Sequence, residues 1–179
     1  RDSHGFMWIS TSNGLDRYDG YDFIHFNSRN SGNALQSDNV HCVEEDINGN
    51  LWIGTENGLN FFNYQTGKIV GANAMLDTKL NLNSSTISII KKDEVGDIWI
   101  VYDKGLAKLH YDSDNNIHTE IIYRSTSTIT AFLRLNGSIY LGIDNQVCRL
   151  IRGSNGIYKK VTAGDKLRNL LGFVNVIYY

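Results

Sequence analysis

Asp-Ile-Asn-Gly-Asn-Leu-Trp-Ile-Gly-Thr-Glu-Asn-Gly-Leu, residues 46–59, is the stretch that decides the fold, because its pattern recurs along the chain. The pattern is Asp-x-x-Gly-x-x-Trp, a short apolar run and then Gly-Leu. It begins at Asp2, Asp46 and Asp93, and a fourth, degenerate copy lacks this Asp. The anchor aromatics are Trp8, Trp52, Trp99 and Tyr140, at spacings of 44, 47 and 41 residues. Periods of about 40 to 50 residues are typical of propellers and of helical arrays.

The periodicity inside one repeat favours strands over helices. The apolar run 51–55 is short and rich in β-formers, and Asn57-Gly58 follows it, which predicts a type I′ hairpin turn with positive φ at both central residues. Asn13-Gly14 repeats this signal, and residues 46–49 read as a turn that precedes the Trp strand. Further strands are expected near 40–44, 59–63, 68–71 and 86–91. The sequence therefore predicts four strands per repeat.

Four short antiparallel strands in each repeat predict an all-β protein, a β-propeller built of four-stranded blades, with about four blades present. The first blade, residues 1–36, lacks its first strand. The following blades span residues 37–83, 84–126 and 127–170, and a further blade starts at 171–179. Because both ends cut across the period, we expect a fragment. Either the terminal segment 173–178 completes the first blade and closes a four-bladed ring, or the chain forms an open arc with exposed edges.

The recurring aromatic residues are expected to have a structural role. A single blade is too small to bury its own faces, so stability comes from stacking neighbouring blades. Trp8, Trp52 and Trp99 are therefore interpreted as wedges between blades, because a ligand contact has no reason to recur in every blade. The other structural positions of the repeat are Gly14, Gly58, Gly105 and Tyr140.

Composition excludes several classes of function. The formal net charge is -2, with 17 basic and 19 acidic residues mixed along the chain, which disfavours nucleic-acid binding through this region. No apolar run is as long as a membrane helix, so we expect no membrane contact. The five histidines show no close pairing, and we expect no metal and no cofactor.

The repeat resembles a known family, the two-component regulator propeller of hybrid two-component sensors of Bacteroidetes. The resemblance rests on residues 46–59, on Leu35-Gln36-Ser37-Asp38-Asn39-Val40 and on the early stretch 17–23. It weakens in the fourth copy, where Arg134 replaces the Asp and Gln146 replaces the Gly. The resemblance implies a periplasmic sensor region with seven-bladed propellers. The chain would then be part of one such ring, and the other blades and a second copy of the chain would be its partners.

By the same resemblance, the function is the detection of glycan-derived oligosaccharides to regulate polysaccharide-utilisation genes. The chain itself would be a sensing piece without catalytic residues, and its parent protein a sensor histidine kinase. Loops on a rigid scaffold carry ligand sites. Polar loop and turn residues that could bind a sugar or its sulfate or carboxylate are Arg29, Asn30, Glu56, Asn57, Asp103 and Lys104.

Two other classes of function stay open at the level of sequence. An interaction or dimerisation scaffold without a small ligand predicts an exposed apolar patch. A propeller glycosidase or lyase needs two carboxylates across a pocket, and Glu56 and Asp103 occupy comparable positions on neighbouring blades. Polar turn residues are nevertheless the default on any protein surface, and the turn by itself explains Asn57.

Overall fold

The computed structural model describes residues 1–76 and 80–162, which form fifteen strands in four antiparallel sheets. The first sheet comprises β1 (Met7–Thr11), β2 (Gly14–Tyr18) and β3 (Phe23–Phe26). The second comprises β4 (Val40–Glu45), β5 (Leu51–Thr55), β6 (Gly58–Asn63) and β7 (Lys68–Gly71), followed by one 3-10 turn, η1 (Ala72–Ala74). The third comprises β8 (Ile87–Lys92), β9 (Ile98–Tyr102), β10 (Gly105–Tyr111) and β11 (Ile117–Arg124). The fourth comprises β12 (Ile129–Leu135), β13 (Ser138–Ile143), β14 (Gln146–Arg152) and β15 (Tyr158–Thr162).

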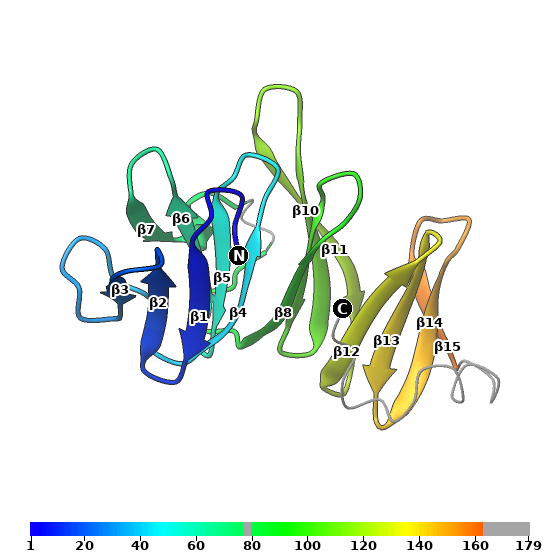
Figure 1. The fold of residues 1–179 in the computed structure, drawn as a ribbon. Helices are drawn as coiled ribbons and strands as arrows, with labels where there is room; N and C mark the ends of the chain where they lie inside the picture. Colours follow the sequence, from blue (N-terminus) through cyan, green and yellow to red (C-terminus); the bar gives the residue numbers. More distant parts are fainter. Residues whose placement is uncertain (77–79, 163–179) are drawn as a thin grey trace.

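The sheets are propeller blades, and they follow one another in chain order (Figure 1). Within each sheet the strands pair in sequence order, and the first strands β4 and β8 of neighbouring sheets lie side by side. The first and fourth sheets lie at opposite ends of the row in Figure 1, so the described residues form an open arc. The predicted fold class is confirmed. The further blade expected at 171–179, with the segment that could close a ring, lies outside the described residues.

Three apolar clusters hold the blades together, one at each junction. Each cluster joins buried side chains of two consecutive sheets, and a fully buried side chain of this size stabilises the fold by about 1.5 to 3 kcal/mol. Representative members are Leu15 and Phe62 at the first junction, Trp52 and Ile87 at the second, and Trp99 and Leu141 at the third. The tertiary core is thus a series of interfaces between blades.

Each Trp lies at the junction between its own blade and the next. Trp52 is fully buried and Trp99 nearly so, whereas Trp8 is half-buried and packs on Phe26 and Phe62 with ring centroids 5.7 and 5.3 Å apart. Tyr140, the anchor of the fourth blade, is also half-buried. The described residues place no further blade against it.

The recurring Asp links consecutive blades through its two carboxylate oxygens. Oδ1 accepts the backbone N–H groups of the residues two and four positions later, as in Asp46, which receives Asn48 and Asn50 at 2.9 Å each. Oδ2 accepts a donor from the next blade at all three junctions. These pairs are Tyr64 with Asp2, Tyr111 with Asp46, and Arg134 with Asp93. In the first and third repeats the indole N–H of the blade's own Trp also donates to Oδ2.

The prediction of a type I′ turn at Asn57-Gly58 is wrong. Thr55 pairs with Gly58, so the two-residue loop is Glu56-Asn57, and neither residue has positive φ. The reason is the Thr55 hydroxyl, which accepts the Asn57 N–H at 3.3 Å and donates to the Gly58 carbonyl at 2.8 Å. The type I′ geometry occurs instead in the degenerate fourth repeat, where Asp144 and Asn145 have φ of 52° and 58°.

Gly58 follows this loop and is not part of a type I′ turn. It is required because of its backbone conformation and its close contact with neighbouring segments. Gly58 has φ of +118°, and its N–H donates to the Ser85 carbonyl of the next blade at 2.9 Å. A Cβ at this position would collide with the side-chain amide of Gln36. Gly58 therefore permits close contact between its hairpin and the segments that lead into two blades.

We expect Gly58→Ala to destabilise the chain by about 1 to 3 kcal/mol, because φ of +118° is disfavoured for alanine and the side-chain amide of Gln36 must move away from the new Cβ. Urea denaturation measures the change in the free energy of unfolding. The matched control is Gly67→Ala, where φ is +66° and no atom lies within 4 Å of the added Cβ. Equal losses in the two variants would contradict the steric explanation.

Tyr111→Phe tests the link between blades. The hydroxyl of Tyr111 donates to Oδ2 of Asp46 at 2.5 Å, and Asp46 is only 2% exposed. A hydrogen bond to a charged group contributes about 1.5 to 3 kcal/mol, so we expect a loss of that size in the free energy of unfolding. Tyr21→Phe, at a side chain that is 92% exposed, should leave stability unchanged. Similar losses in the free energy of unfolding in both variants would show that the hydrogen bond between Tyr111 and Asp46 is not the cause.

The first link gives stability a dependence on pH. Partial burial acts to raise the pKa of Asp2, but hydrogen bonds from Tyr64, Trp8 and the backbone of Phe6 and His4 outweigh it, and the pKa is lowered. A lowered pKa stabilises the fold above the unfolded value of about 4, and this contribution is lost as pH falls through the folded pKa. We expect the destabilisation caused by Asp2→Asn to be larger at pH 7 than at pH 3 in urea titrations. A difference that does not vary with pH would contradict this assignment.

Candidate functional site

One end of the sheets gathers, from all four sheets, the turn that follows the strand with the anchor aromatic residue. We call this end the hairpin face; its turns are residues 12–13, 56–57, 103–104 and 144–145, at the lower edge of Figure 1. Backbone hydrogen bonds tie these turns to the segments that lead into the next blade, as from Gly14 to Asp38 at 2.6 Å and from Ser125 to Lys104 at 2.6 Å. The hairpin face is therefore built of loops on a rigid scaffold.

A polar hollow opens on this face between the third and fourth blades. It has a volume of about 320 Å³ and is lined by Thr86, Ser88, Asp103, Lys104 and Thr128. The residues that line it are two threonines, a serine, an aspartate and a lysine. Hydroxyls donate and accept hydrogen bonds, so the hollow can pair with a ligand rich in hydroxyl groups, and Lys104 can pair with an anionic substituent.

The lining of the hollow is held by hydrogen bonds within the fold. Oδ1 of Asp103 accepts the Thr86 backbone N–H at 2.9 Å, and the Thr86 hydroxyl donates to the Glu56 carbonyl at 3.1 Å. Ser88 donates more weakly to Val101, at 3.4 Å. The backbone of Asp103 is in the left-handed region, with φ of 40°. The side chain of Lys104 is exposed.

The structure brings together some of the predicted ligand residues and separates others. Asp103 and Lys104 line the hollow, whereas Glu56 does not; only the backbone carbonyl of Glu56 contacts a lining residue, Thr86. Oε2 of Glu56 accepts the Asn39 side chain at 3.3 Å. The backbone N–H of Asn57 bonds to Thr55 in the turn. The sequence interpretation did not single out Thr86, Ser88 or Thr128, although Thr86 and Thr128 end the segments that lead into β8 and β12, and Ser88 lies within β8.

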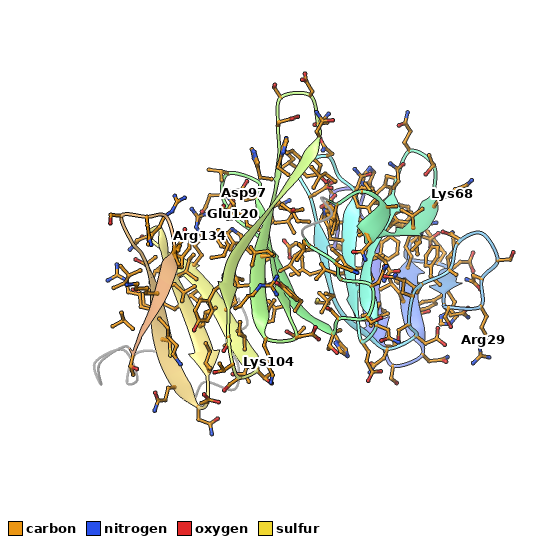
Figure 2. The ribbon with its side chains drawn as sticks, turned by 180° about the vertical axis from the view of Figure 1, so that it is seen from behind. Arg29, Lys68, Asp97, Lys104, Glu120 and Arg134 are labelled. Carbon is orange, nitrogen blue, oxygen red and sulfur yellow. The ribbon has the colours of Figure 1, made fainter. Side chains whose placement is uncertain are left out.

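Arg29 and Asn30 belong to a different part of the molecule. Both lie in the loop between β3 and β4, where Arg29 donates its backbone N–H to Asn27 at 2.9 Å and Asn30 donates its side chain to the His25 carbonyl at 3.0 Å. Figure 2 shows Arg29 and Lys104 well apart, on the first and third blades. These two residues therefore do not contribute to the hollow.

Among residues 1–76 and 80–162, no cluster of His, Cys, Asp and Glu has the arrangement of a metal site. The described part of the chain also contains no helix of the length and hydropathy needed to cross a membrane. Cys42 and Cys148 are free thiols in different blades, and burial raises the pKa of Cys42 to about 12. A thiol with this pKa stays protonated at neutral pH and is a weak nucleophile.

Residues 34–57, which contain the segment leading into β4, the strand β4 itself, the Asp turn and β5, match the family model described as the two component regulator propeller. These residues are similar to one two-component regulator propeller repeat. This match confirms the family resemblance on which the sequence interpretation rests. None of the curated proteins matches the chain.

Solved structures share the fold of these repeats at low sequence identity. The extracellular domain of the hybrid two component system BT3049 from B. thetaiotaomicron is 16% identical, with a TM-score of 0.63, over 88% of this chain and 22% of that one. PorZ, a surface component of the type-IX secretion system of Porphyromonas gingivalis, is 15% identical, with a TM-score of 0.66, over 88% and 25%. Virginiamycin B lyase from Staphylococcus aureus is 16% identical, with a TM-score of 0.59, over 90% and 53%.

These likenesses are informative about the fold. The chain spans 22% to 53% of the length of these three structures, which are an extracellular domain of a hybrid two component system, a secretion component and an enzyme. One fold thus carries three unrelated functions, and function has to be argued from the site.

Proposed function

We propose that the chain is a ligand-sensing part of the periplasmic region of a hybrid two-component sensor histidine kinase. In this role it detects glycan-derived oligosaccharides and so regulates polysaccharide-utilisation genes. The repeat at residues 34–57 supports the assignment to a two-component sensor. The observation that carries the proposed ligand class is the hollow on the hairpin face, which is lined by the polar residues Thr86, Ser88, Asp103, Lys104 and Thr128.

The chemistry of the hollow fits an oligosaccharide better than an apolar ligand. Its side chains offer several donors and acceptors, and sugar hydroxyls need both. Lys104 has an exposed ammonium group on a flexible stem, which can follow a hydroxyl or a negatively charged substituent. Binding between two blades also gives the ligand a way to affect output, because a ligand shifts an equilibrium toward the arrangement that it binds more tightly.

We propose no catalytic role for this chain. The two carboxylates that could have formed an acid and base pair are engaged within the fold: Asp103 accepts the backbone of Thr86, and Glu56 accepts the side chain of Asn39. An acid and base pair acts on substrate only if both groups reach it. The likeness to a lyase is a likeness of fold.

One surface favours the alternative, an interaction scaffold without a small ligand. Met7, Ile9 and Phe23 of the first blade are 41%, 36% and 61% exposed. Their strand register, through Tyr18, places Met7 and Phe23 on one face of the sheet. A second copy of the chain is the partner that this alternative predicts. Exposed apolar side chains gathered on one face are typical of an interaction surface.

Calorimetric titration of the 179-residue chain with a panel of plant and host oligosaccharides of defined length tests the proposal. We expect saturable binding to one linkage class, and a loss of about tenfold in affinity for Lys104→Ala, since one charge-assisted hydrogen bond is worth about 1.5 kcal/mol or more. Lys68→Ala removes the same charge from the outer strand of the second blade, well apart from Lys104 in Figure 2, and should bind as the unchanged chain does.

Two results would contradict the proposal. If the folded chain bound none of the oligosaccharides, an oligosaccharide site in these blades would be excluded and the interaction scaffold would be favoured. Equal losses in the Lys104 and Lys68 variants would place the binding outside the hollow.

A further inference from the structure

Because the blades repeat, residues at equivalent positions of two junctions between blades can be compared directly. Phe61 pairs with Trp52 across the second and third strands of its blade, and Lys108 pairs with Trp99 in the same way one blade later. On the outer strand, Val70 lies beside Phe61, and Glu120 lies beside Lys108. Positions that are apolar at one junction are therefore charged at the next.

The blade on the other side of the junction also differs between the two junctions. At the junction of the second and third blades, Phe61 belongs to the same apolar cluster as Tyr111 and Ile117, which pair with each other across β10 and β11. The corresponding pair across β14 and β15 is Arg152 and Tyr158. At the junction of the third and fourth blades the apolar cluster is thus replaced, at its outer end, by charged and aromatic groups from both sides.

The result is a groove between these two blades. It has a volume of about 130 Å³, and its polar lining is Asp97, Lys108 and Glu120 from the third blade with Arg134, Arg152 and Tyr158 from the fourth. Trp99 is also part of its wall. Figure 2 shows Asp97, Glu120 and Arg134 close together, with Lys104 at the other end of the same blades. The groove is therefore separate from the hollow on the hairpin face.

Most of the charges in the groove are already paired. Lys108 lies 2.9 Å from Asp97 and 3.8 Å from Glu120. Arg134 is held by Asp93 and by Glu94, the latter at 3.3 Å. These pairs fix the walls of the groove, and they leave their cations little capacity for an additional partner.

Arg152 is the exception. Its side chain is 62% exposed, its single carboxylate neighbour, Glu120, lies 4.0 Å away, and its Nε donates weakly to the Gly156 carbonyl at 3.4 Å. The guanidinium lies over the ring of Tyr158, 5.8 Å from its centroid, which orients it. Arg152 therefore retains donors in a planar fork, the geometry that matches a carboxylate or sulfate.

The fourth blade has a positive local charge that the chain as a whole does not have. Residues 129–162 contain five basic side chains and one acidic side chain, while the formal net charge of the chain is -2. The basic residues are Arg134, Arg149, Arg152, Lys159 and Lys160, and the acidic one is Asp144. A surface with this charge attracts anions and raises their local concentration.

We propose that the groove between the third and fourth blades is a second ligand site, for an anionic sugar residue. The guanidinium of Arg152 binds the carboxylate or sulfate, and the Tyr158 ring contacts the apolar face of the sugar. The carboxylates of Asp97 and Glu120 accept its hydroxyl groups while they remain paired with Lys108. Because the site uses neither Asp103 nor Lys104, its existence does not depend on the hollow of the hairpin face.

Titration of the 179-residue chain with three probes tests this site. The probes are a galacturonic acid trisaccharide, which has carboxylates only, a carrageenan tetrasaccharide, which has sulfates only, and the uncharged agarose tetrasaccharide. We expect saturable binding of at least one anionic probe and at least tenfold weaker binding of the neutral one. Which anionic probe binds more tightly distinguishes carboxylate from sulfate.

Matched variants assign the binding to the groove. Arg152→Ala should lower the affinity for the anionic probe about tenfold. Arg152→Lys should cause a smaller loss of affinity, because lysine keeps the charge but lacks the planar guanidinium. Arg149→Ala removes the same charge from the same strand, at a side chain that bonds to Ser138, and should change affinity less than twofold. Lys104→Ala should also have no effect.

Three outcomes would overturn the proposal. Equal losses for the Arg152 and Arg149 variants would show unspecific attraction to a basic blade. Binding that is lost with Lys104→Ala but kept with Arg152→Ala would belong to the hairpin face, and would leave the proposed sensing function standing while removing this second site. No saturable binding of either anionic probe to the folded chain would remove the site outright.

Discussion

The bond between the recurring Asp and a donor of the next blade is the constraint on which this structure depends. A single four-stranded sheet cannot bury either of its faces, so each blade is stable only against its neighbours. At all three junctions the Asp carboxylate closes its own turn with one oxygen and accepts a side chain of the following blade with the other. The same group thus fixes the turn before each Trp strand and the relative position of consecutive blades.

The third junction keeps the link between blades but differs from the other two in its polar contacts. Arg134 stands where the pattern has Asp, and it reaches back to Asp93, so the departure from the pattern preserves the link between blades. The outer end of this junction exchanges apolar packing for ion pairs around Lys108. Partly buried ion pairs stabilise less reliably than apolar contacts. They lie beside the exposed Arg152, where we propose the second ligand site.

The sequence predicted the propeller and part of the candidate site. Periodic Trp and Gly residues are local signals, and they predicted four blades of antiparallel strands. Asp103 and Lys104 could be found because they occupy a turn. Thr86 and Thr128 were not singled out, because whether they share a space depends on how two blades meet. Arg29 lies apart from Lys104, in the loop between β3 and β4, and its ligand role stays a prediction. The predicted type I′ turn was wrong because the Thr55 hydroxyl holds the loop in another conformation.

The sequence by itself determined the repeat, the strand composition of each blade and the positions that face a neighbour, because these follow from local periodicity and from spacing along the chain. Only the tertiary structure decided which polar side chains share a space. The hollow at Lys104 and the groove at Arg152 are each lined by residues of two blades. Their lining depends on the angle and register of one sheet against the next, which is set by packing across the junction, and no local pattern encodes it.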